Sequence, residues 1–244
     1  MIIRLQNNRR IRLYLLLIIF IIILATISTH ASNKLLTIYH QRQSLIIADR
    51  YQKTILVQPN PLGYFAEYTD AVPDRFREFV LAQEDKYFYF HPGFNPISIL
   101  RAATKSKARG SSTITQQLVK LLLSQENQRT IKNKITELVY AISLELNLSK
   151  KEILTMYANS LYLGNNTQGI ASASQLYFSK DPNALSDQEL VALITTIRNP
   201  VSQNPFRKIS KTYSLSLAKK VNDNALQPLN LSSQTIEQRK QAFR

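Results

Sequence analysis

The longest apolar segment of the chain lies close to its N-terminus. Residues 11 to 29 read IRLYLLLIIFIIILATIST and are almost unbroken in apolar character from Leu13 to Ile27. A helix that spans a bilayer needs roughly 17 to 25 such residues, and the flanking residues complete that length. The pattern therefore predicts a single transmembrane helix over residues 13–30.

The charges before this segment predict its orientation. Four arginines precede it, namely Arg4, Arg9, Arg10 and Arg12. Positive residues stay on the cytoplasmic side, so residues 1–12 are expected to form a cytoplasmic basic tail and the remaining chain to lie outside. A cleaved signal peptide is the alternative. We favour an uncleaved signal anchor, because the apolar run is long and no clean small-residue cleavage motif follows it.

Residues 31–70 have a mixed pattern. They contain two short stretches that alternate, LLTIYH and KTILVQ, and then a break at Pro59-Asn60-Pro61. Alternation with a period of two is typical of strands. We therefore expect a connector here that contains one hairpin.

Beyond residue 71 the apolar positions recur at helical spacing. A helix is expected from Asp74, which can cap it, and Glu84 falls at its end. Residues 129 to 148 predict another helix, whose apolar positions are Ile135, Leu138, Val139, Ile142 and Leu146. Capping boxes predict three further starts, Thr113-x-x-Gln116, Ser149-x-x-Glu152 and Ser186-x-x-Glu189. Residues 210 to 244 read as one or two amphipathic helices.

Composition supports a mainly α fold. Glycine is scarce at 5 residues and hydrophobic residues make up 44% of the chain, which is enough for one domain with a substantial core, expected over residues 71–244. The absence of cysteine excludes disulfides, a thiol nucleophile and cysteine-bound metal.

The net charge of +15 indicates an anionic partner or environment. No nucleic-acid-binding motif is present, so no nucleic-acid partner is expected. Anionic lipid headgroups or a phosphorylated substrate suit a tethered protein better.

Residues 84 to 120 carry the densest set of candidate chemical groups. Glu84 and Asp85 precede an aromatic cluster, and a basic segment then leads to a small-residue turn and a helix with Lys120. This order suits a carboxylate that works beside a phosphate. From composition alone, Glu84 is equally a base and a solvated acid at a helix end, while Glu137 is better explained as an ion-paired helix residue. The three histidines make no metal constellation.

Taken together, these segments resemble glycosyltransferase family 51, the peptidoglycan glycosyltransferases. The pattern E-D-x-x-F-x-x-H-x-G is met by Glu84, Asp85, Phe88, His91 and Gly93. The pattern G-x-S-T-I-T-Q-Q-x-x-K is met by Gly110, Ser112, Thr113, Ile114, Thr115, Gln116, Gln117 and Lys120. Two further motifs are met by Arg129, Lys134 and Glu137, and by Lys150 or Lys151, Ile153, Leu154, Tyr157, Asn159, Tyr162 and Gly164.

The sequence departs from the family pattern at three positions, and the segment from Lys120 to Arg129 is one residue longer than usual. Asn95 stands where an aspartate is usual, Ser111 where a second glycine is common, and Asn133 where an arginine usually precedes Lys134. Asn133 removes a cation from the phosphate side of the site. None of the three removes Glu84 or Glu137.

The resemblance implies a lysozyme-like, two-lobed helical domain that polymerises lipid II into β-1,4-linked glycan by inverting transfer. Glu84 would be the catalytic base and Glu137 would support it. Substrate and pyrophosphate would be bound by Lys120, Arg129, Lys134, Ser112, Thr113 and Gln117. The motifs would be supported by Asp85, Phe88, His91, Gly93, Gly110, Gln116, Tyr157 and Asn159. No cofactor is required, and a divalent cation, Mg²⁺ or Mn²⁺, is left open.

The implied partners are lipid II, the glycan-linked undecaprenyl pyrophosphate and the membrane, with other cell-wall synthases or division proteins left open. The implied location is the bacterial cytoplasmic membrane, with the catalytic domain on its outer face. No transpeptidase segment follows in the sequence, so a monofunctional enzyme is expected. The alternatives are a catalytically impaired scaffold and, less favoured, a lytic glycosidase.

Overall fold

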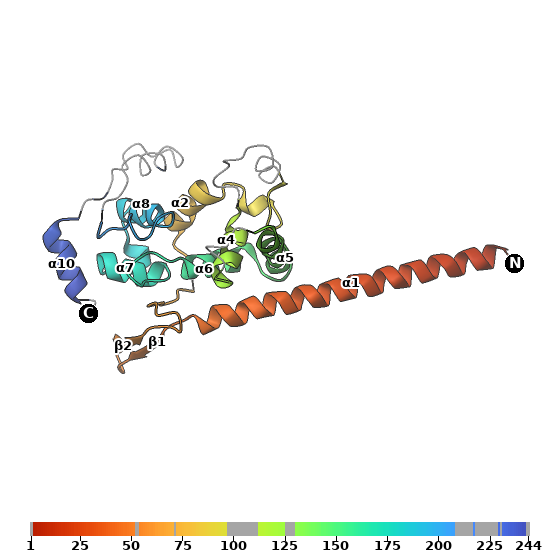
Figure 1. Ribbon diagram of the computed structural model, residues 1–244, viewed down its shortest axis with the longest axis horizontal. Helices are drawn as coiled ribbons and strands as arrows, with labels where there is room; N and C mark the ends of the chain where they lie inside the picture. The colour runs from red at the N-terminus through yellow and green to blue at the C-terminus, as the bar shows by residue number, and fades with distance from the viewer. Residues whose placement is uncertain are drawn as a thin grey trace.

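The computed structural model describes residues 2–51, 54–70, 72–96, 112–124, 130–207, 217, 229 and 231–242. A long N-terminal helix leads into a helical domain, and a small hairpin lies near the junction (Figure 1). The predicted fold class is confirmed, because the domain is mainly α and consistent with a lysozyme-like fold behind one long apolar helix. The elements are α1 (Ile2–Gln41), β1 (Leu45–Ala48), β2 (Thr54–Gln58), α2 (Asp74–Glu84), η1 (Phe88–Phe90), α4 (Ile114–Leu122), α5 (Ile131–Asn147), α6 (Lys150–Ser160), α7 (Ile170–Phe178), η2 (Pro182–Ala184), α8 (Asp187–Thr196) and α10 (Ser233–Ala242).

Helix α1 is long and apolar enough to cross a membrane. It does not end near residue 30 as predicted but continues to Gln41, so the stretch LLTIYH is helical and not part of a connector. Leu35 and Tyr39 lie four residues apart and are both buried in the domain core. Residues at this spacing share one face of a helix, and this tertiary packing outweighs the alternating pattern that suggested a strand.

A hairpin is present in the predicted connector, but only its second strand falls on a predicted stretch, KTILVQ, and its first strand follows LLTIYH. Strands β1 and β2 pair antiparallel, with Leu45 opposite Gln58 and an irregularity between Ile47 and Ala48. After β2, a bend at Asn60 leads into an extended segment that crosses the domain. In this segment the backbone N–H of Phe65 donates to Asn166 and its carbonyl accepts from Gln168.

The core is one cluster of buried side chains contributed by all the larger helices and by the end of α1. Helix α4 packs against α5 and α6, α2 packs against α8, and α1 lies against α5. Tyr157 and Tyr177 are the largest fully buried side chains. The arrangement places the end of α2 and the start of α4 next to one another, and these ends carry the motif residues.

The three predicted capping boxes are confirmed at Thr113, Ser149 and Ser186. The predicted cap at Asp74 is wrong. Pro73 occupies the N-cap position without a side-chain bond, and Asp74 is the first helical residue, where its carboxylate pairs with Arg77 at 2.6 Å. A proline before the first turn already fixes the backbone, and an aspartate inside that turn still favours the positive end of the helix dipole.

Helix α5 has an unusual distribution of side chains. Its inner face contributes Glu137, Ala141, Ser143 and Leu144 to the buried part of the protein. Its largest apolar side chains point outward, with Ile131 82%, Ile135 58%, Val139 50% and Leu146 71% exposed. The helix is therefore amphipathic as its sequence predicts, but much of its apolar stripe faces away from the core.

Candidate active site

Glu84 is the last residue of α2, and its side chain is only 11% exposed. Gln117 of α4 brings its Nε2 to 3.5 Å from one carboxylate oxygen. Arg198, which follows α8, brings its Nε to 3.6 Å from the other oxygen. Gln117 is itself held by the hydroxyl of Tyr157, which donates to its Oε1 at 3.0 Å. The carboxylate thus lies where three elements meet, with its orientation controlled from both sides.

The neighbouring carboxylate, Asp85, has a structural position. It is buried, and both of its oxygens lie 3.0 Å from His91 Nε2. The backbone N–H of Ile114, at the first turn of α4, donates to it at 2.9 Å. A buried carboxylate needs hydrogen-bonding partners of this kind. The predicted supporting role of Asp85 and His91 therefore corresponds to a clamp between α2 and α4.

Gly93 and Thr113 form a second connection in this region. The Thr113 hydroxyl caps α4 and also donates to the Gly93 carbonyl at 2.7 Å. Gly93 has a φ of +84°, and a Cβ there would lie 3.0 Å from the Ala141 carbonyl oxygen and from Glu145 Cγ. Both the left-handed backbone and the close contact with α5 require glycine at this position.

Sequence reasoning missed the role of Glu145. This carboxylate pairs with Lys150 at 2.7 Å and accepts a hydrogen bond from Thr115. Lys150 also donates to the His91 carbonyl at 2.7 Å and lies over the Phe88 ring, 4.4 Å from its centroid. The motif that begins at Lys150 or Lys151 signalled the lysine, whereas none of the motifs included the glutamate.

The second predicted carboxylate, Glu137, lies on the inner face of α5 and is buried. Lys134 donates to it at 2.8 Å and to the Ser112 hydroxyl at 3.0 Å. The structure thus brings Glu137, Lys134 and Ser112 together as predicted. It also shows that Glu137 is ion-paired, as expected from the residue alone, so its negative charge serves to orient the lysine.

Asn159 supports the site from a distance. Its side chain is buried and contacts the Tyr39 hydroxyl of α1 at 2.7 Å. It also binds both the N–H and the carbonyl of Thr69, at 3.0 and 2.9 Å. Asn159 thereby joins the anchor helix, the extended segment and α6. This motif residue acts on the architecture and has no described contact with Glu84.

A groove of about 290 Å³ opens beside Glu84, and the two residues that contact its carboxylate, Gln117 and Arg198, also line this groove. Lys120 and Arg198 give the groove two positive charges, and Tyr162 and Leu161 form part of its wall. Cations beside a carboxylate suit a substrate that carries a phosphate near its reacting carbon. Sequence reasoning did not identify Arg198, because none of the motifs included it.

Two predicted site residues, Arg129 and Gly110, lie outside the described residues, as does the basic segment between residues 97 and 111. Within the described ranges, no group of three or more histidines, aspartates or glutamates is arranged to hold a metal ion. The role of Arg129 and the involvement of a divalent cation remain predictions.

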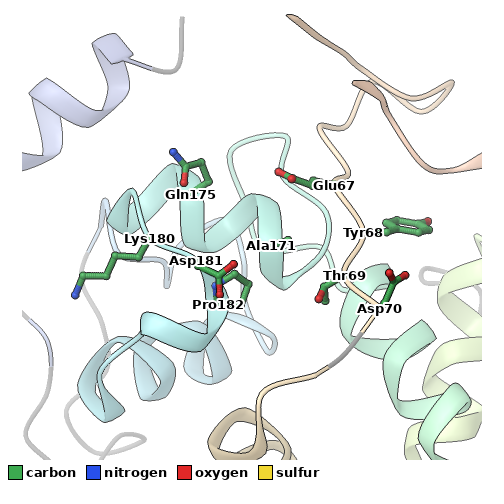
Figure 2. Close-up of a pocket in the computed structure, with 9 residues that line it drawn as sticks. All are labelled: Glu67, Tyr68, Thr69, Asp70, Ala171, Gln175, Lys180, Asp181 and Pro182. Carbon is green, nitrogen blue, oxygen red and sulfur yellow. The ribbon is translucent and has the colours of Figure 1, made fainter. Parts of the chain in front are cut away.

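A second cavity, of about 310 Å³, contains none of the predicted site residues. Figure 2 shows Glu67, Thr69 and Asp70 of the extended segment on one side of it, and Lys180, Asp181 and Pro182 after α7 on the other. Its lysine is paired with Glu189 at 2.9 Å. The excess of carboxylates over cations makes this cavity unsuited to a phosphate, so the groove beside Glu84 is the better candidate.

Comparison with known proteins adds independent support. The family model described as Transglycosylase matches residues 63–225. Penicillin-binding protein 4 of Bacillus subtilis is 37% identical over 149 residues, which cover 59% of this chain and 24% of the relative. Penicillin-binding protein 1A of Escherichia coli is 36% identical over 148 residues, 58% of this chain and 17% of the relative. Penicillin-binding protein 1A of Neisseria lactamica is 36% identical over 191 residues, 76% and 24% respectively. The chain thus spans about a quarter or less of the length of these relatives.

Proposed function

Since the chain belongs to the transglycosylase family, we propose that it polymerises lipid II into the β-1,4-linked glycan strands of peptidoglycan. The chain is a glycosyltransferase enzyme by this membership. The donor in the proposal is the growing glycan on undecaprenyl pyrophosphate, and the acceptor is the 4-hydroxyl of a lipid II sugar.

One observation carries the proposal. The nearly buried carboxylate of Glu84 contacts Gln117 and Arg198, and both of these residues line a groove that also contains Lys120. A base and an anion-binding surface are the two groups that this transfer needs on opposite sides of the reacting carbon. Hydrolysis of a glycan needs no such cationic surface, which disfavours the lytic alternative.

In the proposed reaction Glu84 takes the proton of the acceptor hydroxyl as its oxygen attacks the anomeric carbon of the donor. The new carbon–oxygen bond forms while the bond to pyrophosphate breaks, and pyrophosphate leaves with the electron pair. A single displacement inverts an α-linked donor to a β bond. Gln117 and Arg198 hold the carboxylate in place, at 3.5 and 3.6 Å.

The leaving pyrophosphate needs positive charge rather than a proton donor. Lys134 is held at 2.8 Å by Glu137 and at 3.0 Å by Ser112, so its ammonium group is oriented before substrate binds. Preorganised charge of this kind stabilises a transition state without a reorganisation cost. Lys120 supplies a second cation from the groove, and the proposal assigns Arg129 to the same task.

The proposed location follows from α1 and the arginines before it. With the N-terminus in the cytoplasm, the catalytic domain lies on the outer face of the bacterial cytoplasmic membrane. Both lipid-linked substrates are then confined to the surface that holds the enzyme. Other cell-wall synthases or division proteins are proposed partners only.

The test is to incubate the detergent-solubilised full chain with labelled lipid II and to separate the products by length. The wild type should make polymer, the Glu84→Gln variant should make at least about a hundredfold less, and both should bind lipid II. Glu78→Gln is the matched control, because Glu78 lies on the same helix and is exposed. Polymer from Glu84→Gln at the wild-type rate would remove Glu84 as the base. Lipid II binding without polymer from the wild type would contradict polymerisation and support the scaffold.

A further inference from the structure

Arg42 is the first residue after α1, and its side chain reaches the C-terminal end of α4. Its Nη1 donates to the Leu121 carbonyl at 2.8 Å, and its Nη2 donates to the Leu122 carbonyl at 2.7 Å and to the Ser124 hydroxyl at 2.8 Å. The last four carbonyls of an α-helix have no partner within that helix, and the helix dipole favours a cation there. The planar guanidinium therefore caps α4 from outside, with two donors on consecutive carbonyls.

The backbone of Arg42 is itself fixed. Its N–H donates to the Tyr39 carbonyl at 3.1 Å, and its carbonyl accepts from Asn60 Nδ2 at 2.7 Å. Asn60 is buried, and its Nδ2 also lies 3.2 Å from Gln168 Oε1. The guanidinium thus extends from a backbone that is held on both sides, and it joins the end of α1 directly to the end of α4.

Helix α4 carries two residues of the proposed site. Gln117 contacts Glu84, and Lys120 lies in the last turn of the helix, directly before Leu121. Gln117, Lys120 and Leu121 all line the groove. The first turn of α4 is held by Asp85, which accepts from the Ile114 N–H. Arg42 holds the opposite end, in the turn that contains Lys120.

A cap stabilises a helix whatever the helix carries, so a stabilising role alone is the alternative. The local geometry points further. Helix α4 has only nine residues, and Ser124, just beyond it, has a φ of +53°, a conformation that is uncommon for a residue other than glycine. The Arg42 guanidinium contacts both this serine and the final helical turn. Without these bonds the last turn is the part of α4 that would open first, and Lys120 would move with it.

We propose that Arg42 is a positioning residue for the transfer reaction, which fixes the last turn of α4 so that the Lys120 ammonium group is held in the groove. This inference rests on the proposed function of that groove. Arg42 does not occur among the described residues that line the groove, so it acts through α4. Preorganised charge stabilises a transition state only where its position is set in advance, and a displacement of about 1 Å costs up to about a hundredfold in rate.

The kinetic test replaces Arg42 in the detergent-solubilised full chain and measures lipid II polymerisation well below the unfolding temperature of each variant. Arg42→Met keeps most of the side-chain length but removes the donors and the charge. We expect its kcat to fall at least about tenfold while KM stays within about threefold, because the lost interaction belongs to the transition state. Arg42→Lys keeps a cation with several donors and should recover kcat to within about threefold of the parent.

Lys180→Met is the matched control. It also removes a cation that bonds to a partner within the protein, but this partner is Glu189, beside the second cavity and not on α4. Its kcat should stay within about threefold of the parent.

A second measurement reads the position of α4 without turnover. The chain has no cysteine, so Lys120→Cys and Gln188→Cys provide two defined sites for spin labels, and Gln188 is exposed on α8. The distribution of distances between the labels is measured by pulsed electron paramagnetic resonance. Adding Arg42→Met should broaden this distribution at least about twofold, whereas Arg42→Lys and Lys180→Met should leave it close to that of the labelled parent.

The two measurements together decide the proposal. An unchanged distance distribution in Arg42→Met would overturn it. Broadening with an unchanged kcat would also overturn it, because the cap would then serve stability alone. A lower kcat without broadening would show that the charge of Arg42 acts on the groove directly, which contradicts positioning. If the wild type makes no polymer, the proposed function fails instead, and the label distances still show whether Arg42 fixes Lys120.

Discussion

The carboxylate of Asp85 accepts a 2.9 Å hydrogen bond from the backbone N–H of Ile114, 29 residues further along the chain. This bond joins the C-terminal end of α2 to the first turn of α4, where the helix dipole favours a negative charge. Glu84 precedes Asp85, and Gln117 lies one turn beyond Ile114. The contact between Glu84 and Gln117 is therefore controlled by the aspartate next to the proposed base.

Asp85→Asn should destabilise the domain and lower its activity. The amide keeps one acceptor oxygen but loses the negative charge that strengthens the hydrogen bonds with His91 and the Ile114 N–H. The free energy of unfolding should therefore fall by about 2 kcal/mol. Thermal unfolding in detergent measures the change. Asp74→Asn, on the exposed side of the same helix, is the control and should cost under about 0.5 kcal/mol. Equal losses in the two variants would show that the clamp contributes nothing.

Gly93→Ala should cost more stability than Gly63→Ala. Both glycines have a positive φ, +84° and +79°, so both variants carry the backbone penalty of about 1 kcal/mol. Only at Gly93 does the new Cβ meet other atoms, at 3.0 Å, whereas nothing lies within 4 Å at Gly63. We expect an additional loss of about 1–2 kcal/mol at Gly93 from this overpacking. Chemical denaturation of both variants tests the difference, and a larger loss at Gly63 would contradict it.

Lys134→Met should separate activity from stability. The Lys134 side chain is 47% exposed, so its ion pair with Glu137 contributes under about 1 kcal/mol to folding. If it binds the leaving pyrophosphate, its removal should slow polymer formation by at least about a hundredfold. Lys132→Met, also exposed on α5, should stay within about threefold of the parent. A variant of Lys134 that is as active as that of Lys132 would remove Lys134 from the site.

Glu189→Gln should lower stability at neutral pH and lose this effect in acid. Burial disfavours ionisation of Glu189, but hydrogen bonds from Lys180 and Ser186 outweigh it and hold its pKa below the usual range. With the folded pKa depressed, the contribution is complete above the unfolded value, about 4.3, and is lost as pH falls through the folded pKa. Unfolding temperatures of both proteins between pH 7 and pH 3 should converge in acid. A difference that stays constant with pH would contradict this assignment.

Much of the fold was predictable from local chemistry. The capping boxes at Thr113, Ser149 and Ser186 each satisfy backbone groups within a few residues, so the sequence around them decides where the helices begin. Of the hairpin, only the second strand was predictable, from the alternation in KTILVQ. The continuation of α1 through Leu35 and Tyr39 was not, because only contacts with distant residues such as Asn159 make the helical form the better one.

The site was predictable as a set of residues but not as a set of contacts. Motif order brought Glu84, Gln117, Lys134 and Glu137 into one hypothesis, and the structure brings them close together in two pairs. Arg198 and Glu145 were missed because their partners, Glu84 and Lys150, are supplied by other elements. The outward direction of the α5 stripe was also hidden, since periodicity shows that a helix has an apolar side and not where that side points.

The uninterrupted helix α1 connects its apolar N-terminal part rigidly to the catalytic domain. One helix carries both Ile27, whose side chain is exposed, and the core residue Leu35, so no flexible joint separates them. Each residue added to an α-helix turns the part of the chain beyond it by about 100° and advances that part by about 1.5 Å. One alanine inserted after Ile27 would thus turn the domain by about 100° relative to the apolar part of α1. Four alanines would nearly restore the original rotation of the domain about the α1 axis while moving the domain about 6 Å further along that axis. The rotation of the domain and its distance from the apolar segment can therefore be varied separately by insertions in this single helix.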